Sequence, residues 1–265
     1  MQAGAYYPYE RAVFDRPGDP LDSLKIQAIK PIVIDSPRSL RYYPTTMTNK
    51  NIRLVKHIIF DLDGTLIDSS LGVAEAANYA LTAAGEKPRS LEEIARFIGY
   101  PLEEMFKTFT DAPPDTLTAA FQVRARHTVV ASATALPGVE ALLPRLQSAG
   151  YTLAVATTKY KVHTEGIIRK LGWEAYFAAL VSGDEVARVK PAPDIIELAL
   201  RRLQACPDDT VMIGDTINDI IAARAAGITR IIAVKSPFGA DNIASYKPDL
   251  MIARFSDLRE VFDLP

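Results

Sequence analysis

Acidic residues follow two apolar segments of the sequence, and their spacing could support metal-assisted chemistry. The segment HIIF is followed by Asp61 and Asp63, and the segment TVMIG is followed by Asp215 and, four residues later, Asp219. Two carboxylates so close in the chain repel each other unless a cation lies between them or one is protonated. Carboxylate oxygens are ligands that suit a hard divalent cation such as Mg²⁺. A turn at Asp-Gly on a solvated strand end is the ordinary alternative for the first pair.

Residues that suit a phosphoryl group follow other apolar segments. Thr157 and Thr158 come after YTLAVA, and Lys190 lies in ARVKPAPD. Each has an ordinary explanation, since Thr158 could be a helix N-cap, Lys190 a solvated loop residue and Asp219 an acid that favours a helix start. Taken together, the acids, the hydroxyl and the ammonium predict Mg²⁺-assisted phosphoryl transfer with a carboxylate nucleophile.

The elements that must position these residues alternate between strands and helices. Short segments rich in Val, Ile and Ala predict parallel strands buried on both faces: VKHIIFDL, YTLAVAT, AYFAALVSG, TVMIGD and TRIIAV, with DLMI as a weaker last strand. Helical patterns such as YKVHTEGIIRKLG, APDIIELALRRLQ and NDIIAARAAG lie between them. This order predicts an α/β fold with an open, Rossmann-like parallel sheet, whose strand ends face one crevice.

One long block interrupts this alternation. Residues 70–133 carry no strand pattern, and Ser90 with Glu93 forms the capping-box spacing that begins a helix. We therefore expect an irregular N-terminal arm at residues 1–52, a catalytic core at 53–69 and 134–265, and an inserted, all-helical cap at 70–133.

Composition excludes several classes of protein. The chain has 265 residues, 48% of them hydrophobic, a formal net charge of −2 and a pI near 6.0. A nucleic-acid partner is not expected, because there is no basic surplus. A membrane span is not expected, because no apolar run reaches about 18 residues. The single cysteine, Cys206, excludes a disulfide within the chain. With no secretory pattern at the N-terminus, these features favour a cytoplasmic protein.

Four motifs, in this order, are similar to those of one family. FDLDGTLIDS, TTK, KPAPD and GDTINDI resemble the haloacid dehalogenase-like hydrolases, and the resemblance covers residues 55–265. VATTK and SYKPDLMIARFSDL are similar to segments of its phosphoglycolate phosphatases and related bacterial pyrophosphatases. The resemblance implies a Rossmann-like core with a helical cap, Mg²⁺ as cofactor, and a phosphatase that acts on a small phosphorylated metabolite.

The resemblance also implies roles for the residues of the first motif. Asp61 would be the nucleophile that forms an aspartyl-phosphate. Asp63 would act as acid and base, and its backbone carbonyl would bind Mg²⁺. Gly64 and Thr65 would shape the loop beside the nucleophile.

The later motifs imply the rest of the site. Thr157, with Thr158 beside it, and Lys190 would bind the transferring phosphoryl group. Asp215 would bind the metal directly, and Asp219 would support the metal, through water or through Lys190.

Several functions stay open at the level of sequence. Phosphoglycolate is the leading substrate, and inorganic pyrophosphate and nucleoside monophosphates are its rivals. Asp63 disfavours dehalogenation, and the absence of histidine from residues 70–80 disfavours a β-phosphoglucomutase. A non-catalytic binding protein is disfavoured because no catalytic position is lost. The cap arginines Arg96, Arg124 and Arg126 could reach a second anionic group, although each alone is expected at the surface. A monomer or a homodimer is expected.

Overall fold

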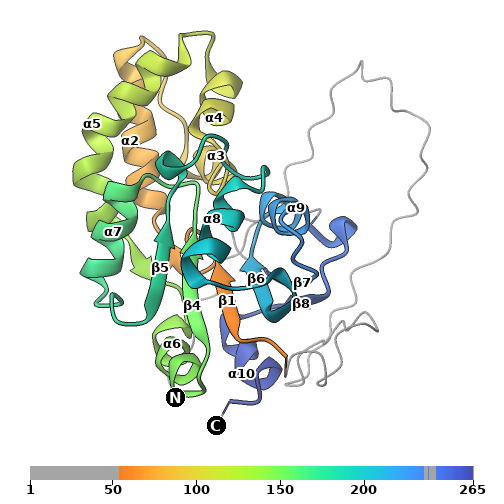
Figure 1. Cartoon of the computed structure of the whole chain (residues 1–265). Helices are drawn as coiled ribbons and strands as arrows, with labels where there is room; N and C mark the ends of the chain where they lie inside the picture. The colour runs from red at the N-terminus through yellow and green to blue at the C-terminus, as the bar shows by residue number, and fades with distance from the viewer. Residues whose placement is uncertain (1–53, 236–237, 239–242, 265) are drawn as a thin grey trace, which may run out of the picture. The chain divides into compact units, whose positions relative to one another are not determined.

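A six-stranded parallel sheet forms the centre of the structure (Figure 1). The computed structural model describes residues 54–235, 238 and 243–264. The strands lie in the order β5-β4-β1-β6-β7-β8. Their bounds are β1 His57–Phe60, β4 Thr152–Ala156, β5 Phe177–Val181, β6 Thr210–Gly214, β7 Arg230–Val234 and β8 Leu250–Ile252. The predicted strands and the predicted fold class are therefore confirmed.

Two apolar layers cover the sheet because successive strand residues point to opposite faces. In β1, Ile58 and Phe60 join one buried cluster and Ile59 joins the other. Helices α6 (Val139–Ser148), α7 (Lys161–Lys170) and α10 (Leu258–Val261) contribute to the first cluster. Helices α8 (Asp194–Leu203) and α9 (Ile217–Ala225) contribute to the second. The motifs therefore follow strands that are fixed on both sides.

Four helices form the inserted segment, in agreement with the predicted helical cap (Figure 1). They are α2 (Ser70–Ala83), α3 (Leu91–Ala95), α4 (Leu102–Phe109) and α5 (Pro114–Ser132). Ser90 and Glu93 make both hydrogen bonds of the predicted capping box. The chain leaves and re-enters the core through β2 (Ile67–Asp68) and β3 (Thr134–Ala135), which pair antiparallel.

Helix α5 of the insertion is fastened to helix α7 of the core. Gln122 Oε1 lies 3.0 Å from His163 Nε2, and Lys170 Nζ donates to the carbonyl oxygens of Ala131 at 2.6 Å and Ala133 at 2.8 Å. These bonds hold the carbonyl end of α5, where a cation is favoured by the helix dipole.

Short helical turns complete the described residues: η1 Gly183–Glu185, η2 Pro207–Asp209, η3 Ile243–Tyr246 and η4 Phe255–Asp257. None of the helices described is long and apolar enough to cross a membrane. The predicted arm, residues 1–52, lies outside the described residues, and the division into arm, core and cap stays a prediction.

Candidate active site

Three buried aspartates meet where β1 and β6 end. One carboxylate oxygen from each of Asp61, Asp215 and Asp219 lies within 4.8 Å of the others. Asp61 follows β1 and Asp215 follows β6, and these strands are direct neighbours in the sheet. Asp219 lies in the first turn of α9, which begins just after Asp215. The structure thus brings together three of the four predicted metal-binding residues through their carboxylates.

Lys190 supplies the counter-charge inside this cluster. Its Nζ donates to Asp61 Oδ1 at 2.5 Å, to Asp219 Oδ1 at 2.6 Å and to the carbonyl of Ala156 at 3.0 Å. The side chain is 1% exposed. Burial acts to lower the pKa of Lys190, but the carboxylates of Asp219 and Asp61 outweigh burial and hold the pKa above its ordinary value. Lys190 is therefore a charged ammonium fully satisfied by its bonds.

Asp61 keeps one oxygen available for chemistry. Its Oδ1 accepts from Lys190, whereas its Oδ2 is buried with no hydrogen-bond partner among the described residues. Burial raises the pKa of Asp61 to about 7 against the opposing charge of Lys190, and Asp219 adds to the rise. A buried oxygen without a partner is costly. It fits a position that a metal ion or a reacting phosphorus atom would face.

Asp219 and Asp215 are oriented by neighbouring hydroxyl groups. Asp219 Oδ2 accepts from Thr216 N at 3.0 Å and from Thr216 Oγ1 at 2.8 Å, as in a capping box. Asp215 Oδ1 accepts from Thr65 Oγ1 at 3.1 Å. A Cβ on Gly214 would lie 2.4 Å from Asp219 Cγ, so only glycine fits there. These bonds fix the direction in which both carboxylates point.

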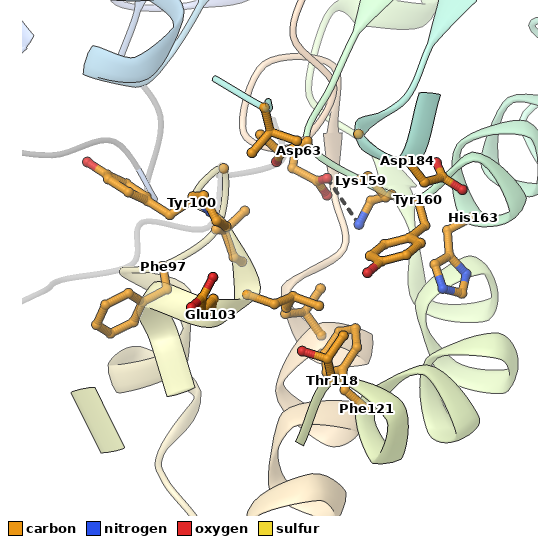
Figure 2. Close-up of a pocket in the computed structure, with 18 of the residues that line it drawn as sticks. Asp63, Phe97, Tyr100, Glu103, Thr118, Phe121, Lys159, Tyr160, His163 and Asp184 are labelled. Carbon is orange, nitrogen blue, oxygen red and sulfur yellow. Dashed lines mark ion pairs between the residues drawn. The ribbon is translucent and has the colours of Figure 1, made fainter. Parts of the chain in front are cut away.

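Asp63 is held apart from this cluster by different partners. Its Oδ1 accepts from Ser69 Oγ at 2.5 Å, and its Oδ2 lies 3.0 Å from Lys159 Nζ (Figure 2). β1 ends at Phe60, so both Asp61 and Asp63 lie beyond the strand. The two carboxylates therefore have separate surroundings and can take separate roles.

The remaining predicted residues lie around these carboxylates. Thr157 is buried after β4, and its Oγ1 accepts from Lys159 N at 3.2 Å. Gly64 takes a left-handed conformation (φ 82°), and its N–H donates to Ile67 O at 2.8 Å, which closes the turn after Asp63.

Thr158 is half-buried and is not the N-cap of the following helix. The N-cap of α7 is Tyr160, which makes no side-chain cap bond. Asp184 Oδ1 accepts from the first helical N–H, that of Lys161, at 2.7 Å. The helix start is thus satisfied from a distant loop, and Thr158 lines a cavity.

A cavity of about 340 Å³ lies between the helical insertion and the strand ends. Asp63, Thr158, Lys159, Tyr160 and Gly183 line it from the core. Residues of α2 and α5, the loop 97–101 and the start of α4 line it from the insertion. Figure 2 shows Lys159 and Tyr160 on one side, Thr118 and Phe121 below them, and Tyr100 and Glu103 on the other side.

Two residues beside Asp63 were not predicted as part of the site. Lys159 follows the threonine pair directly within the TTK motif, so its position could have drawn attention. Ser69 carries no comparable signal, because a serine before a helix is ordinary. The sequence does not show that both side chains contact Asp63, because that contact depends on the path of the chain after Phe60.

The cap arginines are exposed at the surface, as expected for each alone. Arg96 pairs with Glu92 at 3.0 Å on the surface, and Arg124 pairs with Glu75. Arg126 and His127 are exposed on α5. Within the described part of the chain, none of the three arginines lines the cavity.

The acidic cluster fits Mg²⁺. Three buried carboxylates face one ammonium, which leaves an excess of negative charge, and Asp61 Oδ2 still lacks a partner. Oxygen donors and excess negative charge are what this cation requires. Asp63 does not contribute its carboxylate to the cluster.

Known proteins are similar to this chain in sequence and in fold. The family model described as haloacid dehalogenase-like hydrolase matches residues 58–233. A probable phosphatase, IndB, from Dickeya dadantii is 34% identical over 76% of this chain and 90% of the relative. Pyrophosphatase PpaX from Bacillus velezensis is 30% identical over 81% of this chain and 98% of the relative.

A solved structure agrees with these matches. The predicted phosphoglycolate phosphatase from Haemophilus somnus 129PT superposes with a TM-score of 0.70 at 25% identity, over 78% of this chain and 98% of that one. The family match includes residues of five of the six strands of the sheet, the insertion and all four motifs, and it ends before β8. The chain therefore belongs to the haloacid dehalogenase-like hydrolase family.

Proposed function

We propose that this hydrolase is a Mg²⁺-dependent phosphatase that releases phosphate from a small phosphorylated metabolite through an aspartyl-phosphate on Asp61. One observation carries the proposal. Asp61 is buried, is oriented through one oxygen by Lys190, and has a second oxygen with no partner beside two further carboxylates. A carboxylate so arranged can attack phosphorus without losing the bond that orients it. Family membership and phosphatase-named relatives support the same activity.

The reaction has two displacements at phosphorus. Asp61 Oδ2 attacks the phosphorus atom, the bond to the alcohol oxygen breaks, and Asp63 gives that oxygen a proton. Asp63 then takes a proton from water, which attacks the phosphorus and releases inorganic phosphate and free Asp61. The position of Asp63 at the wall of the cavity supports this role.

The surrounding residues neutralise charge. Lys190 would balance the charge of the transferring phosphoryl group, and the hydroxyl of Thr157 would donate a hydrogen bond to it. Thr158, Gly64 and Thr65 would form the adjoining loops. Mg²⁺, when bound, supplies charge neutralisation at the phosphoryl oxygens. Its proposed ligands are the carboxylates of Asp61 and Asp215 and the backbone carbonyl of Asp63, with Asp219 in support.

The names of the relatives suggest the first substrates to test. Phosphoglycolate is the leading compound from the sequence motifs, and inorganic pyrophosphate is suggested by the PpaX relative. Nucleoside monophosphates are the third group. A transfer of phosphate to a sugar in place of water is the alternative reaction. A monomeric or homodimeric state and a cytoplasmic location stay predictions.

The proposal is tested by phosphate release and by trapping the intermediate. Phosphate release from a panel of monoesters is measured with and without Mg²⁺ for the unchanged protein and for Asp61→Asn. We expect Mg²⁺-dependent release that Asp61→Asn abolishes. Acid quenching during turnover of a ³²P-labelled ester should leave label on a peptide containing Asp61.

Asp111→Asn is the matched control, because Asp111 is an exposed aspartate of the insertion. It should release phosphate at the unchanged rate. Equal release by Asp61→Asn would refute the nucleophile. Phosphate appearing on added sugar in place of water would favour the mutase.

A further inference from the structure

The charges that line the cavity are mostly negative. Glu103, Asp115 and Asp184 line it together with Asp63, whereas Lys159 is the only lysine or arginine among the described residues that do so. The ammonium of Lys159 is already bound, at 3.0 Å from Asp63 Oδ2 and 3.3 Å from Ser69 Oγ. Glu103 pairs at 2.7 Å with Lys107, which does not line the cavity. A second anionic group on the substrate would still meet more carboxylates than cations.

The one histidine that lines the cavity does not change this balance. His163 is buried, and its Nε2 is bonded to Gln122 Oε1. Burial lowers the pKa of His163 to about 4, and the charge of Lys159 adds to this effect. The ring is therefore neutral where most enzymes work.

Apolar and aromatic side chains also line the cavity. Val73, Leu102, Phe121 and Val129 line it from the insertion, and Tyr160 lines it from the core. In Figure 2 the ring of Tyr160 extends from the side of Lys159 toward the centre of the space, above Thr118 and Phe121. Apolar walls with a few polar groups are typical of sites that hold an uncharged organic group.

The cavity is also large for a very small acid. Its volume of about 340 Å³ falls within the range of sites that enclose a ring-containing ligand, roughly 300–1,000 Å³. Phosphoglycolate and pyrophosphate would place a charged group, and little else, in this space.

From these observations we infer that the preferred substrate is a monophosphate ester of an uncharged, ring-containing alcohol, as in a nucleoside monophosphate, rather than a small acid with a second anionic group. The inference rests on the proposed phosphatase activity. The phosphoryl group lies at Asp61, and the uncharged ring lies between Tyr160 and Phe121. Discrimination arises partly from repulsion of a second anion, which is a common source of specificity.

Three monoesters separate charge from size. Phosphoglycolate and 2-hydroxyethyl phosphate have nearly the same size, but only the first has a carboxylate, whereas uridine 5′-monophosphate adds a ring. We expect kcat/KM to be lowest for phosphoglycolate, higher for 2-hydroxyethyl phosphate, and highest for the nucleotide, by about tenfold at each step. A kcat/KM that is highest for phosphoglycolate or pyrophosphate would overturn the inference.

A charge added inside the cavity gives a second test. Thr118→Arg places a cation among the lining residues, and Thr116→Arg places one on the exposed side of the same helix. Thr118→Arg should raise the ratio of kcat/KM for phosphoglycolate to that for 2-hydroxyethyl phosphate about tenfold. Thr116→Arg should leave the ratio unchanged. An unchanged ratio in a folded Thr118→Arg protein would contradict the proposal that the cavity carboxylates repel a second anionic group of the substrate.

Failure of this inference differs from failure of the proposed function. If no ester releases phosphate, or if Asp61→Asn remains active, the phosphatase mechanism itself is wrong. If release requires Mg²⁺ and Asp61 but favours the acidic substrates, only the substrate class is wrong. Circular dichroism confirms that each arginine variant is folded before its ratio is read.

Discussion

Lys190 is the residue on which the buried charges of the site depend, because its ammonium binds both Asp61 and Asp219. Lys190→Met should lower the free energy of unfolding by about 3 kcal/mol, since it leaves two buried carboxylates without their cation. It should also lower phosphate release by at least about 100-fold. Urea unfolding and phosphate release measure the two effects.

Lys87→Met is the control for this change, because Lys87 is an exposed lysine of the insertion. Its unfolding free energy should change by less than about 0.5 kcal/mol. If Lys190→Met is as stable as Lys87→Met, Lys190 is not needed to balance the cluster.

His163 gives the protein a specific dependence on pH. Its pKa is about 4 in the folded chain and 6.5 as the ordinary value, so the unfolded chain binds more protons between these values. The part of the stability that is linked to His163 is therefore fully present above pH 6.5 and is lost as the pH falls toward 4. The free energy of unfolding should fall less between about pH 7 and pH 5 in His163→Gln than in the unchanged protein, by about 1 kcal/mol. The difference is no larger because solvent screens part of the effect.

Urea unfolding of both proteins at the two pH values measures this difference. His127→Gln provides the comparison, since His127 is exposed on α5. An identical loss of stability in the unchanged and His163→Gln proteins would mean that other groups cause the acid sensitivity.

At the scale of residues, sequence predicted the members of the site better than their contacts. Asp61, Lys190, Asp215 and Asp219 meet because neighbouring parallel strands bring their ends to one edge. The bond of Asp63 to Ser69 and Lys159 could not be predicted in the same way, since it depends on the turn after Phe60.

The loop between α3 and α4 is a second place where the insertion meets the core. Gly99 lies in this loop with φ +87°, and a Cβ there would lie 2.9 Å from Thr216 Cγ2. Gly99→Ala should therefore push the loop away from Thr216, which orients Asp219. We expect kcat/KM to fall about tenfold while the protein stays folded.

Gly85→Ala separates steric contact from backbone strain. Gly85 also has a positive φ, +83°, but a Cβ there would meet nothing within 4 Å. Both variants should lose about 1 kcal/mol of stability, because alanine disfavours this conformation. Only Gly99→Ala should lose activity.

A second change offers rescue of Gly99→Ala. Thr216→Ser removes the methyl group that the new Cβ would meet and keeps the hydroxyl group that binds Asp219. Gly99→Ala should lower activity less in the Thr216→Ser protein than in the unchanged protein. Absence of rescue would contradict a direct contact between the loop and Thr216.

At the scale of elements, long periodic segments were predictable and short ones were not. All six strands of the sheet were expected, but β2 and β3 have only two residues each, too few to show a pattern. Helix α6 was not among the predicted helices, and it contains Pro144, which argues against a helix in a sequence. The hydrogen bond that satisfies the first N–H of α7 could not be predicted, because its acceptor, Asp184, lies far away in the chain.

For the whole molecule, the buried acids predict stabilisation by a divalent cation. Binding of Mg²⁺ to Asp61, Asp215 and Asp219 would favour the folded chain over the unfolded chain. Millimolar MgCl₂ should therefore raise Tm by about 5 °C when its concentration is far above the Kd for Mg²⁺. Differential scanning fluorimetry with and without MgCl₂, at constant ionic strength, measures this rise.

Asp215→Asn should remove most of the rise, and Asp111→Asn should keep it. This readout does not depend on turnover, so it tests the metal site independently of the substrate. A rise of the same size in Asp215→Asn would show that Mg²⁺ acts elsewhere on the protein.

The two ends of the insertion lie side by side, because Ile67 pairs with Ala135 and Asp68 pairs with Thr134. This bears on how one insertion could replace another. The chain leaves the sheet and returns to it at adjacent residues, so an inserted segment of any length begins and ends at the same place. A different insertion could therefore be exchanged in this position without moving Asp61 or Lys190. Ester preference and the machinery of attack could then be inherited, or engineered, as separate modules.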